Sequence, residues 1–147
     1  MNKQERLNSL YTKYGLGKED VFKSPQGWTI ITRSGIDKIQ ANANITINYE
    51  VQALKPTFVV MKAIGSMDDQ TIETFGEADC GTDGSKSNCR QNYPVAMAEK
   101  RAMSRVVLKL SGFYAEGVFG EDEADDFGAE VKKQRKAATK PNLTDLA

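Results

Sequence analysis

Four cations at helical spacing are the side chains of this sequence whose types best suit a binding chemistry. They lie in the stretch 92–112, NYPVAMAEKRAMSRVVLKLSG, and no acid stands among them on their side of the predicted helix. A helix turns about 100° per residue, so these positive charges would be neighbours on one surface. Such a surface favours phosphate binding, and an ordinary solvated helix face is the alternative. This side consists of Lys100, Arg101, Ser104, Arg105 and Lys109.

The remaining positions of this stretch indicate how the helix is held. Asn92 can cap its first turn and Gly112 suits its C-terminal exit. Met97 and Leu108 project among the cations, so that side is not purely solvent-like. Glu99 projects from the apolar side, where we expect a structural anchor that accepts hydrogen bonds or pairs with a cation, rather than a catalytic acid. The apolar side contains Val95, Ala96, Ala98, Ala102, Met103, Val106, Val107 and Leu110.

Charge is distributed unevenly along the 147 residues, although the net charge is zero. Residues 1–115 carry 15 Lys and Arg against 12 Asp and Glu, a net charge of +3. Residues 116–127 carry six acids and no base, and residues 128–147 carry five bases against two acids. We therefore predict an α+β nucleic-acid-binding domain over 1–115, an acidic segment over 116–127 and a disordered basic tail over 128–147.

Several chemistries are disfavoured by composition. The chain has no histidine, which removes the commonest general base and any Ser-His or Cys-His pair. Cys80 and Cys89 leave a zinc site, a disulfide or two incidental thiols open, with incidental thiols as the default. A magnesium-dependent nuclease built on the acids of 121–126 is less favoured than a binding function. We expect no enzyme activity, no cofactor and no metal site.

No apolar run approaches the roughly 20 residues that span a bilayer. The first 15 residues also lack the apolar region of a secretion signal. We therefore expect no membrane partner and a cytoplasmic location.

The hydrophobic pattern predicts the elements that would position the cations. We expect an α+β fold in which one long helix packs on an antiparallel three- to four-stranded sheet, a β-β-β-α core with a short N-terminal helix. Residues 15–27 read as a connector and 65–70 as a polar turn, and a long polar loop precedes the long helix. The expected elements are helices at 3–14 and 35–41, with Ile36 and Ile39 facing inward, and strands at 27–33, 45–54, 57–64 and 71–78.

Single-stranded nucleic acid is the ligand that fits this arrangement best, because it needs a basic groove and flat apolar surface for the bases. The sheet and loops could add Arg33, Lys38, Lys62 and Arg90. A net charge of +3 is modest, so useful binding would need an oligomer that repeats the groove. Most of the aromatic candidates for stacking are expected in the core instead, namely Trp28, Tyr49, Phe58, Phe75 and Tyr93.

The stretch AMAEKRAMSRVVLKL, residues 96–110, carries a family resemblance. With TFGEAD before it and EDEADDF after it, it resembles the C-terminal half of small phage and prophage proteins of the Rad fifty-two type superfamily of single-strand annealing proteins. The resemblance is best over 71–127, with a weaker match at 29–45. It implies a β-β-β-α core, rings or helical filaments, and ATP-independent pairing of complementary strands. On matching positions it places DNA at Lys100, Arg101 and Arg105, and less surely at Lys109.

We thus expect a homo-oligomeric protein of a phage or mobile element that binds and anneals single-stranded DNA during recombination. A passive single-stranded DNA-binding or recombination-accessory protein is one alternative, and a structural or partner-binding protein without a nucleic-acid role is another. The acidic segment could compete with DNA for the basic face, recruit a host or phage recombination partner, or serve as a solvated linker.

Overall fold

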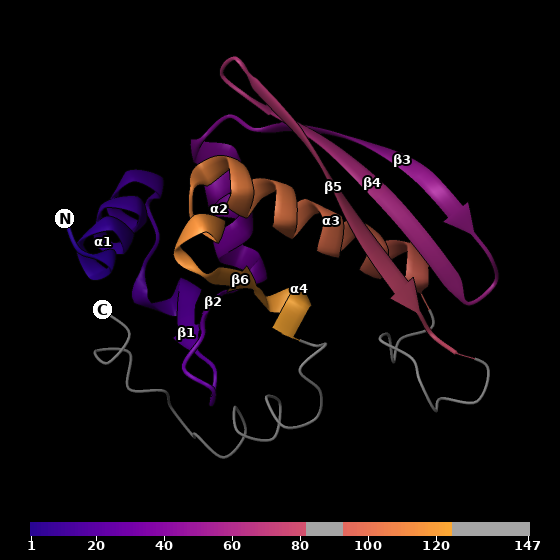
Figure 1. Cartoon of the computed structure of the whole chain (residues 1–147), viewed down its shortest axis with the longest axis horizontal. Coiled ribbons are helices and arrows are strands. Elements are labelled where there is room, and N and C mark those ends of the chain that lie inside the picture. The colour runs from indigo at the N-terminus through magenta and orange to yellow at the C-terminus, as the bar shows by residue number, and fades with distance from the viewer. Residues whose placement is uncertain (82–92, 125–147) are drawn as a thin grey trace.

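The long helix predicted over 92–112 is the centre of the fold. In the computed structural model, which describes residues 1–81 and 93–124, it is α3, Pro94–Ser111. Pro94 opens its first turn, and Gly112 ends it in the left-handed region at φ 96°. Tyr93 is the N-cap residue, and the predicted cap Asn92 lies outside the described residues. Figure 1 shows α3 running between a three-stranded sheet and the remaining elements.

The three predicted consecutive strands form that sheet. They are β3 (Thr46–Leu54), β4 (Phe58–Met67) and β5 (Gln70–Asp79), paired antiparallel in the order β3-β4-β5. The predicted turn over 65–70 is shorter than expected, because Met67 pairs with Gln70 and only two residues remain between them. Asp68 takes φ 54° there, which lets the chain reverse within two residues. The predicted fold class is confirmed.

Small residues on β5 allow the backbone of α3 to approach the sheet closely. A Cβ at Gly76 would overlap the carbonyl oxygen of Ala98 and lie 2.5 Å from the amide nitrogen of Ala102. Two residues away, Thr74 Oγ1 donates a hydrogen bond of 2.7 Å to the Ala102 carbonyl. Helix and strand are therefore in direct backbone contact at this point.

A second sheet forms on the other side of α3. Its strands are β1 (Val21–Lys23), β2 (Thr29–Ile31) and β6 (Val118–Gly120), with β1 antiparallel and β6 parallel to β2. The strand predicted at 27–33 thus joins this sheet and not the larger one. Strands β1 and β6 were not predicted, because three residues are too few to show a period of two.

Helix α2, Arg33–Asn42, begins two residues earlier than predicted. Thr32 is its cap, since Thr32 Oγ1 accepts a 3.1 Å hydrogen bond from the Gly35 amide. Ile36 and Ile39 are fully buried, as predicted.

Helix α1, Lys3–Tyr14, confirms the predicted N-terminal helix. Its start is a capping box between Asn2 and Glu5. It packs against the residue that follows the exit of α3: the Phe113 ring lies 5.8 Å from that of Tyr11 and 6.1 Å from that of Tyr14, centroid to centroid. No helix in the described ranges is long and apolar enough to cross a membrane.

The chain after α3 stays in the fold beyond residue 115. A 3-10 turn (η2, Tyr114–Glu116) leads into β6, and a single helical turn follows, α4 (Glu121–Ala124). A solvated linker, one of the possibilities for this segment, does not describe its acids at 122 and 123: Asp122 and Glu123 are each only 8% exposed. The segment predicted as a disordered tail, 128–147, lies outside the described residues.

The helix covers β4 and β5 but leaves the inner face of β3 open. Leu54 is 66% exposed although its register places it beside fully buried Val59. On α3 the residues facing this opening are Val95, 43% exposed, and one turn later Glu99. The predicted anchoring role of Glu99 is therefore wrong, since its carboxylate meets solvent where we expected a buried partner.

Candidate nucleic-acid interface

Cationic and hydroxyl groups of α3 and α2 converge on three consecutive carboxylates. Arg105 Nε donates to Glu123 Oε1 at 2.7 Å, and Ser104 Oγ donates to Asp122 Oδ2 at 2.9 Å. The backbone amide of Arg33 donates to Glu121 Oε1 at 3.0 Å. We call Arg33, Lys100, Ser104 and Arg105 the oxyanion site, and residues 121–123 the acidic turn.

The second sheet explains why these groups meet. Strands β2 and β6 run parallel, with Ile31 beside Gly120, so the chain leaves both strands at the same end. Arg33 and Glu121 follow within two residues of that pair. A Cβ at Gly120 would lie 2.9 Å from Ser104 Cβ, so glycine lets β6 press directly on α3. The acidic turn is thereby delivered onto the cationic side of the helix.

The surroundings of Asp122 change the pKa of its carboxyl group. Burial raises its pKa above the ordinary value of 3.8, and the charge of Glu121 adds to the increase. The Ser104 hydrogen bond and the positive charges of Arg33 and Lys100 act in the opposite direction. Arg33 Nη1 lies 3.7 Å from Asp122 Oδ2. The cations therefore offset only part of the cost of burying this charge.

The titration of Asp122 predicts a pH-dependent stability. Because its pKa is higher in the folded chain, the folded state holds more protons there between the ordinary and the raised pKa, and its contribution to the free energy of unfolding falls as pH rises through that range. Asp122→Asn lacks this contribution. We expect the stability of wild type relative to the variant to increase on acidification from neutral pH, measured by urea unfolding at several pH values. A difference that stays constant with pH would contradict the prediction.

Two of the predicted phosphate contacts lie away from the oxyanion site. Arg101 is 1% exposed, and its Nη1 donates to the Glu77 carbonyl at 2.7 Å. Lys62 lies on the outer face of β4, 2.9 Å from a carboxylate oxygen of Glu50. Arg101 is therefore an interior residue, and Lys62 lies on the face of the sheet that points away from α3.

The other predicted cations are distributed as follows. Lys100 is half-buried beside the acidic turn, and Lys109 is exposed, with its Nζ 5.2 Å from the ring centroid of Tyr114. Lys38 pairs with the buried Asp20 at 2.7 Å. Arg90 lies outside the described residues. The structure thus brings together Arg33, Lys100 and Arg105, with Lys109 one turn further along α3.

The aromatic residues expected in the core are mostly exposed, contrary to our expectation. Trp28, Tyr49, Phe75 and Tyr93 are all at least 36% exposed, and Phe58 is half-buried. Two of them adjoin the oxyanion site: the Phe75 carbonyl accepts a hydrogen bond from Arg105 Nη1, and the charge of Arg33 acts on Tyr49. Partial burial raises the pKa of the Tyr49 hydroxyl, and the nearby charges of Glu99 and Arg33 act on it in opposite directions.

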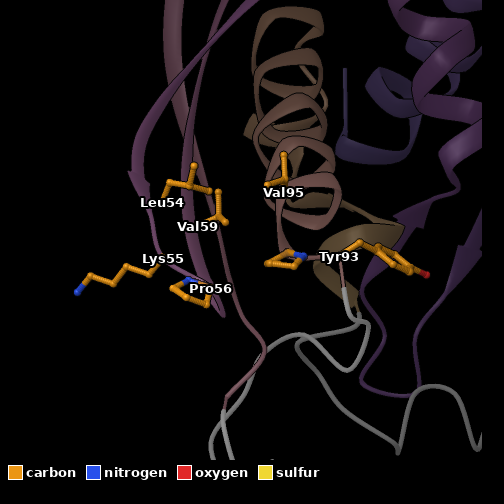
Figure 2. A pocket seen from close by; sticks show the side chains of 7 residues that line it. Leu54, Lys55, Pro56, Val59, Tyr93 and Val95 are labelled. Carbon is orange, nitrogen blue, oxygen red and sulfur yellow. The ribbon is translucent and has the colours of Figure 1, made fainter.

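An open cavity of about 540 Å³ lies where β3 turns into β4, beside the start of α3. Figure 2 shows Leu54 and Val59 on one wall and Val95 on the other, with Lys55 directed outward. Lys55 is its only cationic lining residue. This cavity can accommodate an apolar group but does not supply the charges that a phosphate chain needs.

The sequence allowed the acidic segment to compete with DNA for the basic face, as one of three possibilities, but did not single out Asp122 and Glu123. The available signal was charge complementarity, since cations without acids on the helix are followed by acids without bases over 116–127. Ser104 was recognised only as a member of the cationic side. Its role as the donor to Asp122 depends on the approach of β6.

Fold and site together define an α+β protein whose central helix holds carboxylate oxygens on its cationic side. Comparison with protein-family models, with curated proteins and with solved structures finds no match for this chain. Within residues 1–81 and 93–124, no cluster of Cys, Asp and Glu is arranged to hold a metal ion.

Proposed function

We propose that this protein binds single-stranded DNA at the oxyanion site and anneals complementary strands without ATP, as a homo-oligomer acting in phage or mobile-element recombination. The observation that carries the proposal is the convergence of Arg33, Ser104 and Arg105 on three carboxylates. Guanidinium, amide and hydroxyl donors that hold carboxylate oxygens are the same groups that hold phosphate oxygens.

The proposed interface follows the exposed side of α3. Arg105 and Lys109 are four residues apart, so their Cα atoms lie about 6 Å apart along the helix axis, near the spacing of successive phosphates in an extended strand. Lys100 and Arg33 continue the positive charge toward α2. Tyr49, exposed beside these charges, is the candidate for contact with a base. Arg101 is not part of the interface because it is buried, and Lys62 is not because it lies on the outer face of β4.

The mechanism requires no covalent chemistry. The cations hold phosphates and release counterions, so affinity should fall as salt increases. The bases are left accessible, and a complementary strand pairs with them along the oligomer. One copy offers only a few cations, so repetition of the site in a ring or filament is what makes binding strong.

The double variant Lys100→Gln with Arg105→Gln tests the interface. We expect weaker binding of a labelled oligothymidylate and a log-log salt slope smaller by about 1 to 1.5, because each lost phosphate contact on a single strand removes about 0.7. Fluorescence anisotropy over a range of salt concentrations measures both quantities. Lys62→Gln is the control, since it removes a cation from the opposite sheet face and should leave affinity and slope unchanged. Equal effects of the two sets of changes would refute the proposed site.

Annealing is tested by the pairing of two complementary labelled oligonucleotides without ATP. We expect wild-type protein to accelerate pairing and the double variant to lose the acceleration. Tight binding with unaccelerated pairing would favour a passive single-stranded DNA-binding protein. Absence of binding at low salt by both wild type and Glu123→Gln would favour a structural or partner-binding role.

A further inference from the structure

The acidic turn occupies the same groups that the proposed function assigns to DNA. Each carboxylate accepts a hydrogen bond from one of these groups. Glu123 accepts from the Arg105 guanidinium, Asp122 from the Ser104 hydroxyl, and Glu121 from the Arg33 amide. We propose that residues 121–123 are an internal competitor of the phosphate chain, so that DNA binds only after this turn leaves the oxyanion site. This inference rests on the proposed function and adds its regulation: the protein is autoinhibited by its own carboxylates.

Burial supports direct competition rather than a distant electrostatic effect. Asp122 and Glu123 are each 8% exposed, and Ser104 beneath them is fully buried. A phosphate therefore cannot reach the Ser104 hydroxyl while the turn is in place. Arg105 has a second partner, the Phe75 carbonyl of β5 at 2.5 Å, and this contact does not depend on Glu123. The Arg105 guanidinium can therefore stay beside β5 when the turn leaves.

The contacts that hold the acidic turn against α3 and α2 are of a kind that can break. The turn is a single turn of helix after a three-residue strand, and its specific contacts to α3 and α2 are polar. Burial raises the pKa of Asp122, which means that the closed position carries an electrostatic cost. A long phosphate chain, which presents many charges to the same cations, can displace such a turn by mass action.

Glu123→Gln in the full-length chain tests the competition. The change keeps the shape of the side chain but removes the charge paired with Arg105, so the turn should occupy the site less and the oligothymidylate should bind about three- to tenfold more tightly at low salt. Glu116→Gln is the matched control. Glu116 precedes the turn by five residues and pairs with Arg6 at 2.7 Å, so this variant also loses one negative charge and one ion pair, but away from the site.

A second readout follows the turn itself. The Arg33 amide donates to Glu121, so its hydrogen exchange, measured by NMR, reports whether the turn is attached. We expect exchange at Arg33 to accelerate when wild-type protein binds the oligonucleotide, and to be faster in Glu123→Gln than in Glu116→Gln before any DNA is added.

The outcomes separate this inference from the proposed function. Suppose that wild type binds the oligonucleotide and that Glu123→Gln and Glu116→Gln bind it with the same affinity as each other. Any gain over wild type then comes from net charge alone, and the competitor role is overturned. Unaltered Arg33 exchange on binding would overturn it as well. If neither wild type nor Glu123→Gln binds at low salt, the proposed function itself fails. Binding by Glu123→Gln but not by wild type would support both.

Discussion

Gly76→Ala should lower the free energy of unfolding by roughly 3 kcal/mol, the upper end of the usual cost of overpacking. The added methyl group would overlap the Ala98 carbonyl oxygen and approach the Ala102 amide nitrogen to 2.5 Å. Both atoms belong to the backbone of α3, which cannot move aside by changing a rotamer. The whole helix must shift away from β5, and the hydrogen bond from Thr74 to Ala102 would lengthen with it.

Gly65→Ala provides the matched comparison. Its methyl group would also come within 2.5 Å of a neighbour, but that neighbour is Cγ2 of the Val106 side chain and not backbone. Rotation or a small displacement of one side chain can relieve part of the contact. We expect a smaller loss than at Gly76, with both measured by urea unfolding of the same chain. Equal losses, or a stable Gly76→Ala protein, would show that α3 and β5 are not in direct backbone contact.

Arg101→Ala should destabilise the protein by about 3 kcal/mol, because it leaves a cavity and deprives the Glu77 carbonyl of its donor. Arg101 is 1% exposed, which is unusual for a cation. Its guanidinium joins the middle of α3 to the end of β5. Lys100→Ala is the control for stability, since the adjacent side chain is only half-buried. Urea unfolding measures both variants.

The same variant separates a structural from a phosphate-binding role of Arg101. Under conditions where Arg101→Ala remains folded, we expect the salt slope of DNA binding to match that of wild type. A reduced slope with unaltered stability would return Arg101 to the interface that the family resemblance implies. A variant that changed Arg101 and Arg105 together would not test the interface, because the change at Arg101 acts mainly on folding.

Local patterns were sufficient to predict the main elements. Alternation over 45–54 and 71–78, with β-branched and aromatic residues over 57–64, predicted the three strands of the larger sheet. The spacing of apolar residues predicted the long helix, and Gly112 predicted its end. Helix 3–14 was also predicted from its apolar spacing. These features depend on neighbours within a few residues, so a single sequence contains the information that determines them.

The sequence by itself therefore determined the α+β class, the extent of the central helix and the side on which its cations lie. Only the tertiary structure decided what each side of that helix meets. Arg101 is buried because Gly76 admits the backbone of α3 onto β5, and Glu99 is exposed because α3 does not extend over β3. The acidic turn reaches Ser104 and Arg105 because β6 pairs with β2, which lies almost ninety residues earlier in the chain. Such contacts follow from the packing of distant segments, and helical or strand periodicity does not predict them.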